Sequence, residues 1–325
     1  MGFRPNDKTQ HRNNFDGLRL LGAGMVLVSH QYAVLGLDEP RLGGNTLGRT
    51  GVMLFFAISG YLIAQSWRRD PQPFRFATRR FLRIAPALAV LQLLTMSLLT
   101  VLGISTFDRN PLPAVNGSLW TIPLEIECYL VFLAIALIMR RAGIAMIGLF
   151  LLGWATGAFA YLPWIDGQLT FFGIAFGFGV LLHEHSWLRR PVAAAAMVVL
   201  AVLAWRLSVP SFGVAMLAAA AAIQIGERSW PGWRDAGRYG DLSYGLYLYA
   251  FPVQQLLVMW LGPHRPYPLM LTLTLLASLA LAWLSWHIIE RPALSLKPKP
   301  AQPDIANGGG RLRTAAVEAA SSSPG

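Results

Sequence analysis

The sequence predicts an all-α, polytopic membrane protein with about ten transmembrane helices, and three observations support this fold class. Hydrophobic residues make up 54% of the 325 residues and charged residues only 13%, whereas about a quarter of the residues in a soluble domain are charged. Successive segments approach the roughly 20 apolar residues that a spanning helix needs. Arginine residues collect between alternate pairs of these segments. The predicted spans cover residues 18–36, 51–67, 84–106, 119–139, 143–161, 168–184, 191–207, 210–226, 243–261 and 267–287.

The distribution of basic residues predicts the topology. An even number of spans places both termini on one side, and Lys and Arg are enriched on the cytoplasmic side of membrane proteins. The side that holds both predicted termini is rich in arginine, and the opposite side carries only Arg41, Arg49, Arg109, Arg206 and Arg265. We therefore expect cytoplasmic termini, a multi-pass location in the inner (cytoplasmic) membrane, and membrane lipid as a partner. A homodimer is an open alternative.

The composition divides the chain into two parts. Residues 1–296 hold all the predicted spans and form one transmembrane domain. Residues 297–325 are dominated by Pro, Gly, Ser and other small residues, so we expect a disordered cytoplasmic tail. The net charge of +11 does not indicate nucleic-acid binding, because the basic residues lie between apolar spans and not on one soluble face.

The first span carries two ionisable residues whose spacing is informative. Arg19 and His30 are eleven residues apart, close to three helical turns, so both point to one side about 16 Å apart along the axis. Ionisable residues at bilayer depth are costly and indicate function. A histidine can take a proton from a hydroxyl, and an arginine can hold a phosphate. The pair fits an extended acyl-thioester carrier; a snorkelling arginine and a hydrogen-bonded core histidine are the simpler alternatives.

The segment 68–83 (RRDPQPFRFATRRFLR) contains six arginines and one acid. Within it Arg80 and Arg83 are three residues apart and share a face if the segment is helical. This cluster suits a polyanionic nucleotide or an anionic lipid. The alternative is that the charges serve topology alone.

The segment 116–132 (NGSLWTIPLEIECYLVF) places carboxylates at the start of a span. Pro123 suits the first turn of a helix. Glu125 then lies in that turn, where the macrodipole favours a carboxylate, and Glu127 lies deeper. The two are about 200° apart around the helix, so they cannot both face one pocket, and the sequence does not decide which one faces a site. Trp120 suits a sugar site, although interfacial aromatic residues are common.

Two further segments place polar residues at membrane depth. Ser59 lies beside Gly60 in mid-span, where close helix packing is favoured over a nucleophile because no activating base is adjacent in the sequence. Tyr247 belongs to the tyrosine-rich segment 240–253, which fits a kinked helix lining a polar channel. The chain has no phosphate-binding loop, dinucleotide fingerprint, zinc pattern or cysteine cluster, and we expect neither a metal nor a permanently bound cofactor.

These motifs, taken in order, resemble acyltransferase family 3, a family of integral membrane O-acyltransferases. The resemblance covers residues 13–294 or so, and its specificity comes from six motifs occurring in sequence order. They are Phe15-Asp16-Gly17-Leu18-Arg19 with His30, FFAISGYL (55–62), RRFLRIAP (79–86), SLWT (118–121) with Glu125, SYGLYL (243–248), and Glu290-Arg291-Pro292. The chain departs from the family pattern at Ala250, where many members have histidine, and at Ile126, which separates two glutamates that are usually adjacent.

The resemblance implies transfer of an acyl group, commonly acetyl from acetyl-CoA, to a hydroxyl of a glycan or another sugar-bearing acceptor. Acyl-CoA and the acceptor would then be the partners. The implied catalytic residues are Arg19, His30, Glu125 and Glu127. The implied donor-binding residues are Arg19, Arg79, Arg80 and Arg83. The implied substrate-binding residues are Asp16, Tyr61, Asn116, Trp120 and Tyr247.

Two alternatives stay open at this point. Interior His and Glu residues also suit a proton-coupled transporter or a translocator of a lipid-linked glycan. Within the enzyme class, the acceptor could be a small secreted metabolite such as a macrolide sugar. The sequence decides neither the acceptor nor the length of the acyl chain, nor whether a covalent acyl-enzyme forms.

Overall fold

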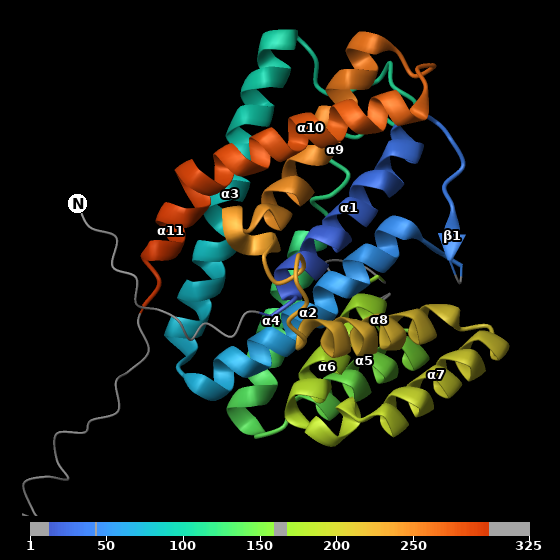
Figure 1. The fold of residues 1–325 in the computed structure, drawn as a ribbon, viewed down its shortest axis with the longest axis vertical. Coiled ribbons are helices and arrows are strands. Elements are labelled where there is room, and N and C mark those ends of the chain that lie inside the picture. Colours follow the sequence, from blue (N-terminus) through green and yellow to red (C-terminus); the bar gives the residue numbers. More distant parts are fainter. Residues whose placement is uncertain (1–12, 43, 159–167, 299–325) are drawn as a thin grey trace, which may run out of the picture.

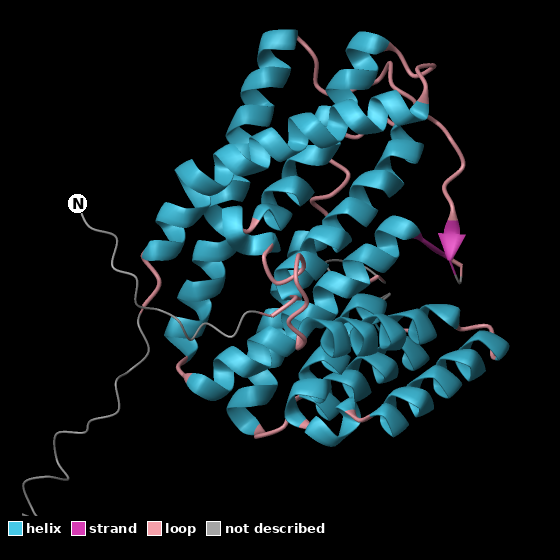
Figure 2. Ribbon diagram, viewed as in Figure 1, coloured by secondary structure: helices cyan, strands magenta, loops and turns pink. Residues whose placement is uncertain are grey.

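The computed structural model describes residues 13–42, 44–158 and 168–298, and this part of the chain is almost entirely helical (Figures 1 and 2). Its α-helices are α1 (Phe15–Val34), α2 (Leu47–Arg69), α3 (Pro73–Leu102), α4 (Thr121–Ile138), α5 (Gly143–Thr156), α6 (Leu169–Glu184), α7 (Pro191–Arg206), α8 (Pro210–Gly226), α9 (Leu242–Leu261), α10 (Tyr267–Ser285) and α11 (Arg291–Ser295). A π-helical turn (Trp286–Glu290) joins α10 to α11, and 3-10 helices cover Ser186–Arg189 and Ala236–Tyr239. Two short strands, β1 (Arg41–Leu42) and β2 (Asn45–Thr46), form an antiparallel hairpin between α1 and α2.

Each predicted span coincides with most of a helix, so the all-α fold class is confirmed. The largest boundary difference is at α3, which begins at Pro73 and not near residue 84. Proline suits the first position of a helix and arginine is a good helix former, so the arginine-rich segment is the first part of a long helix. The β1–β2 hairpin was not predicted. Residues 159–161 of the predicted fifth span and residues 299–325 of the predicted tail lie outside the described residues.

Four helical segments in the described chain are long and apolar enough to cross a membrane, judged by length and composition. They are α2, α3, α4 and the continuous segment Tyr267–Ser295. Helices α5 to α8 are apolar but shorter. Helices α1 and α9 have 20 residues each and carry the polar side chains described below. The number of ten spans therefore stays a prediction.

Helices α1 and α2 form the centre of the molecule (Figure 1). Helix α2 packs against α6 and α8, which lie together with α5 and α7 in the lower right of the figure, and α1 packs against α9, which packs against α10. Large apolar side chains remain exposed on the outer faces; Val101 is 83% exposed and Ile138 is 87% exposed. A lipid surrounding would cover such side chains, whereas large exposed apolar patches are rare in soluble monomers.

Both ends of the described chain lie on one face of the molecule. Asn14 N donates a hydrogen bond to Gly226 O (2.9 Å), so α1 begins beside the end of α8. Arg79 Nη2 donates to Pro298 O (3.4 Å), so the chain after α11 lies beside the beginning of α3. We call this face, which also carries the α2–α3 connection, the arginine face. Ends on a common face agree with an even number of spans, and the cytoplasmic assignment of this face stays a prediction.

Two glycines allow α2 and α6 to touch backbone to backbone. A Cβ atom on Gly60 would collide with the carbonyl oxygen of Phe176, and one on Gly179 would collide with that of Ala57. Small residues are the usual means by which membrane helices approach this closely. Within the Ser59–Gly60 segment, Gly60 therefore makes the close helix packing that the sequence predicts.

Replacing Gly60 with alanine should separate α2 from α6 and lower the stability of the purified protein by about 1–3 kcal/mol, the usual cost of overpacking a core. Thermal unfolding in detergent measures the effect. Gly148→Ala is the matched control, because no atom lies within 4 Å of the Cβ position of this helical glycine. Equal unfolding midpoints for the two variants would show that the contact between α2 and α6 adapts freely.

Candidate active site

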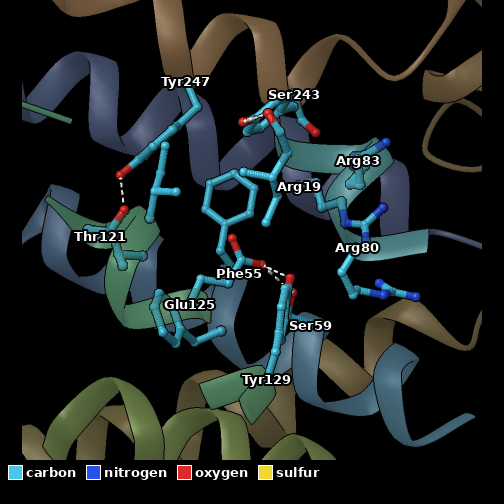
Figure 3. Close-up of a pocket in the computed structure, with 15 residues that line it drawn as sticks. Arg19, Phe55, Ser59, Arg80, Arg83, Thr121, Glu125, Tyr129, Ser243 and Tyr247 are labelled. Atoms are coloured by element: carbon cyan, nitrogen blue, oxygen red, sulfur yellow. Dashed lines mark hydrogen bonds between the residues drawn. The ribbon is translucent and has the colours of Figure 1, made fainter. Parts of the chain in front are cut away.

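A narrow cavity of about 80 Å³ lies between α1, α2, α3, α4 and α9, and three arginines line it (Figure 3). We call it the arginine cavity. Its polar lining residues are Arg19, Ser59, Arg80, Arg83, Thr121, Glu125, Tyr129, Ser243, Tyr244 and Tyr247. Figure 3 shows Thr121 and Tyr247 on one side of it and Arg80 and Arg83 on the other. The cavity therefore has a cationic end and a neutral, hydroxyl-lined end.

The carboxylate of Asp241 holds two of these arginines in place. Its Oδ2 atom accepts hydrogen bonds from Arg83 Nη2 and from Arg19 Nη1 (3.5 Å). Its Oδ1 atom accepts from Ser243 Oγ (2.5 Å) and Ser243 N (3.3 Å), so the same side chain caps the N-terminus of α9. Burial raises the pKa of Asp241, but the two arginines and these hydrogen bonds outweigh it and hold this pKa well below its usual range. Asp241 thus carries a negative charge that joins α1, α3 and α9.

Arg80 differs from its two neighbours because it has no carboxylate partner within the described residues. Its Nε atom is buried without a hydrogen bond, and its guanidinium carbon lies 5.8 Å from the ring centre of Phe76. Lys297, just after α11, adds a further positive charge nearby: burial and the positive charges of the surrounding arginines lower its pKa to about 8. Glu125 lines the same cavity but makes no ion pair with Arg80, so this guanidinium is available to bind an anion.

Glu125 faces the arginine cavity from α4. Its Oε1 atom accepts hydrogen bonds from Ser59 Oγ (2.8 Å) and from the Tyr129 hydroxyl. Thr121, Glu125 and Tyr129 are four residues apart, so they lie on one face of the helix. The folded chain thus places the carboxylate of Glu125 beside Ser59, although no acidic residue is adjacent to Ser59 in the sequence. Glu125 is thus the glutamate that faces the site, whereas Glu127 does not line the cavities described here.

A second cavity, of about 330 Å³, contains His30 and opens on the side opposite the arginine face. We call it the histidine cavity. Its polar lining residues are Ser29, His30, Arg41, Thr46, Arg49, Trp120, Thr121, Gln168 and Tyr247. The hairpin β1–β2 and the beginning of α2 supply one wall. Two of the five arginines that the sequence places on this side, Arg41 and Arg49, line the cavity with the histidine.

The imidazole of His30 is held by two neighbours. Its Nδ1 atom lies 3.4 Å from Ser118 Oγ, and its ring packs edge-on against Phe251 with 5.1 Å between the ring centres. In the tautomer whose Nδ1–H donates to Ser118, the Nε2 atom is free to accept a proton. The arrangement suits a neutral imidazole acting as a base.

The two cavities meet at Val52, Thr121 and Tyr247, which line both. Thr121 Oγ1 and the Tyr247 hydroxyl lie 2.5 Å apart, and Tyr247 also donates to Ser118 O (2.7 Å). These bonds tie α9 to the beginning of α4 at the junction. Arg19 lines one of these adjoining cavities and His30 the other, which agrees with the prediction that both face one side of α1.

The structure places several of the predicted site residues away from the two cavities. Asp16 lies at the start of α1, 3.7 Å from Arg19. Tyr61 bonds to Glu227 and accepts from Arg189 Nη1 (3.0 Å) in another part of the arginine face. Arg79 pairs with Asp70. Asn116 donates to Leu248 O (3.1 Å) and accepts from Ser118 N (3.0 Å), which fixes the turn before α4.

Sequence reasoning missed Asp241, Arg41 and Arg49 as site residues. Asp241 follows Gly240 directly before an apolar segment, a pattern typical of a helix cap, and nothing nearby indicates two arginine partners. The positive-inside rule could have indicated Arg41 and Arg49, since arginines on the outer side of a membrane protein are the exception.

The helical fold, the apolar outer faces and the two adjoining cavities define a membrane protein whose interior holds a histidine in one cavity and arginines in the other. The chain belongs to the acyltransferase domain family, which it matches over residues 12–287. It is therefore an acyltransferase that transfers groups other than aminoacyl groups. This result favours acyl transfer over the transport alternative.

Two curated relatives match nearly the full length of the chain. The O-acetyl transferase of Shigella phage Sf6 is 32% identical over 339 residues, with 88% of this chain and 97% of that protein covered. Nodulation protein 10 of Rhizobium leguminosarum bv. viciae is 29% identical over 369 residues, with 91% and 97% covered. No solved structure matches.

Asp241→Asn should lower the free energy of unfolding at pH 7 by about 3 kcal/mol, because removing the buried carboxylate leaves the charge of two half-buried arginines uncompensated. The arginines lower the pKa of Asp241, so its stabilisation is present above its usual pKa of 3.8 and is lost as the pH falls below it. The difference between variant and wild type should therefore shrink below pH 4.

Unfolding midpoints measured from pH 7 to pH 3 test this prediction. Asp38→Asn, at an exposed position beyond α1, is the control and should leave the midpoint unchanged. A deficit of Asp241→Asn that stays the same at pH 3 would show that charge is not what stabilises this contact.

Proposed function

We propose that this protein moves an acetyl group from acetyl-CoA, bound at the arginine face, to a hydroxyl of a glycan or another sugar-bearing acceptor bound in the histidine cavity. The observation that carries the proposal is the meeting of a cationic cavity and a histidine-containing cavity at Thr121 and Tyr247. A long donor with phosphates at one end and a thioester at the other fits this arrangement. The arginine face would then be cytoplasmic, and the membrane would be the inner membrane.

The arginine cavity supplies what the phosphates of the donor need. Arg80 has a buried Nε atom without a hydrogen bond, while Arg19 and Arg83 are held in place by Asp241. Arginine binds phosphate oxygens through charge-assisted hydrogen bonds. Lys297 lies among the same positive charges, which together with burial lower its pKa to about 8. A bound polyanion would raise this pKa again and keep the side chain charged.

Glu125 belongs to the donor side of the site. It shares the arginine cavity with Ser59 and Tyr129, whereas His30 lies in the other cavity. We therefore propose that Glu125 holds the narrow part of the donor through this hydroxyl network. His30 alone then takes the proton of the acceptor.

The chemical step proceeds at the junction of the cavities. His30 Nε2 takes the proton of the acceptor hydroxyl while the hydroxyl oxygen attacks the carbonyl carbon of the thioester. The carbon–sulfur bond breaks, and the departing thiolate takes the proton back from the imidazolium. The products are the acyl ester and free CoA, and His30 returns to its neutral form.

The histidine cavity has features of a sugar site. Trp120 lines it, is 41% exposed and packs against Phe172 with 5.7 Å between ring centres, and an aromatic side chain of this kind suits contact with a sugar ring. Gln168 and Thr46 supply polar groups around it. One relative is named an O-acetyl transferase, which supports an acetyl donor and a hydroxyl acceptor for this chain.

His30→Ala should reduce acetyl transfer by a factor of roughly 10² to 10⁴, the usual contribution of a general base, without weakening the binding of acetyl-CoA. Purified protein in lipid nanodiscs, radiolabelled acetyl-CoA and an extracted membrane glycan fraction allow both measurements. His264→Ala, at an exposed position after α9, is the matched control. Wild-type turnover by His30→Ala would refute the assignment.

Arg80→Gln should raise the KM for acetyl-CoA by roughly tenfold or more, because a charge-assisted bond to phosphate is lost, and should change kcat less. Acetyl-pantetheine, which lacks the nucleotide and its phosphates, should be used equally by variant and wild type. Arg69→Gln changes the same charge at an exposed position of the arginine face and should leave both constants unchanged. Equal losses with both donors would place Arg80 outside the phosphate site.

A further inference from the structure

A second basic cleft opens on the arginine face, apart from the two cavities of the active site. It has a volume of about 990 Å³ and lies where the end of α2, the end of α4 and the end of α6 meet. Arg68 borders it from α2, and Arg140 and Arg141 border it from the connection after α4. Its lining shares no residue with the arginine cavity or the histidine cavity.

The arginines of this cleft are available to a ligand. Arg68, Arg140 and Arg141 are exposed, and within the described residues their side chains make no hydrogen bond or ion pair. The acid in the cleft, Glu184, is engaged elsewhere: its carboxylate accepts hydrogen bonds from Ala142 N (2.7 Å) and Gly143 N (3.0 Å) at the beginning of α5. The cleft therefore carries an excess of positive charge.

The cleft joins this charge to apolar surface at the membrane edge. A smaller cavity of about 20 Å³ continues inward from it and is lined in part by Ala64, Phe132 and Ala136. On the outer side Leu137 and Ile138 are exposed by 59% and 87%. Both α2 and α4 are long and apolar enough to span a membrane, so their last residues lie at headgroup level. A ligand here meets arginines and hydrocarbon-facing side chains together.

We propose that this cleft binds the phosphodiester headgroup of an anionic phospholipid, with the guanidinium groups on the phosphate and the lipid chains along the apolar end of α4. Basic pockets between membrane helices on the cytoplasmic side are suited to such headgroups, and arginine suits phosphate better than lysine does because its planar group binds two oxygens at once. Positive-inside charge alone does not require an arginine of α2 and two arginines of the connection after α4 to line one cleft.

The test compares two double variants of equal charge. Arg140→Gln/Arg141→Gln removes two arginines of the cleft, and Arg69→Gln/Arg190→Gln removes two exposed arginines of the same face that do not line it. Each full-length protein is purified into micelles of a short-chain phosphatidylcholine, and its thermal unfolding midpoint is followed during titration with a short-chain phosphatidylglycerol. Arg68→Gln, from a different helix, is a second test of the same cleft. Inorganic phosphate is titrated in a parallel series.

We expect phosphatidylglycerol to raise the midpoint of the wild type and of the control variant at similar concentrations. The cleft variants should need roughly tenfold more lipid, because each arginine near an anionic headgroup contributes to its binding. If both double variants need equally more phosphatidylglycerol, the proposal is overturned, and the lipid is attracted by the overall positive charge of the arginine face. Stabilisation by inorganic phosphate that the cleft variants abolish would overturn the assignment to lipid.

Discussion

The ion pairs of Asp241 with Arg19 and Arg83 are the interaction on which the arrangement of the site depends. One oxygen of this carboxylate accepts hydrogen bonds from the arginines of α1 and α3, and the other oxygen caps α9. Charged groups inside a membrane protein are costly unless they are paired. The position of Asp241 therefore fixes where the two arginines can lie, and it leaves Arg80 as the unpaired cation of the same cavity. The proposed anion site and the packing of three helices thus depend on one residue.

The separation of the two cavities follows from the same framework. Helix α1 crosses from the arginine cavity to the histidine cavity, so one element positions both Arg19 and His30. At the junction, Thr121 and Tyr247 bond to each other and to the turn before α4. That turn also places Ser118 beside His30. Thr121, which lines both cavities, and Ser118, which lies beside the imidazole, therefore come from one short segment, and a change in the position of α4 would affect both.

The sequence predicts the helices well because apolar segments of spanning length form helices whatever their neighbours are. It also predicts that Arg19 and His30 face one side, since the spacing lies within a single helix. Contacts between distant segments were not predictable in this way. Ser59 meets Glu125 across 66 positions of the chain, and Arg83 meets Asp241 across 158. The partner of Tyr61 was equally unpredictable: its hydroxyl bonds to Glu227, away from both cavities, and its role as a substrate contact stays a prediction.

The beginning of α3 shows how a local rule and a distant contact combine. Pro73 starts the helix early, which places Arg79, Arg80 and Arg83 within two turns of a helix and not in a loop. Helical spacing then turns Arg80 and Arg83 toward the cavity and leaves Arg79 to pair with Asp70 at the end of α2. Three neighbouring arginines with the same intrinsic chemistry thereby acquire different partners. The helix decides the direction of each side chain, and the presence or absence of an acid at that place decides whether it stabilises the fold or remains available to an anion.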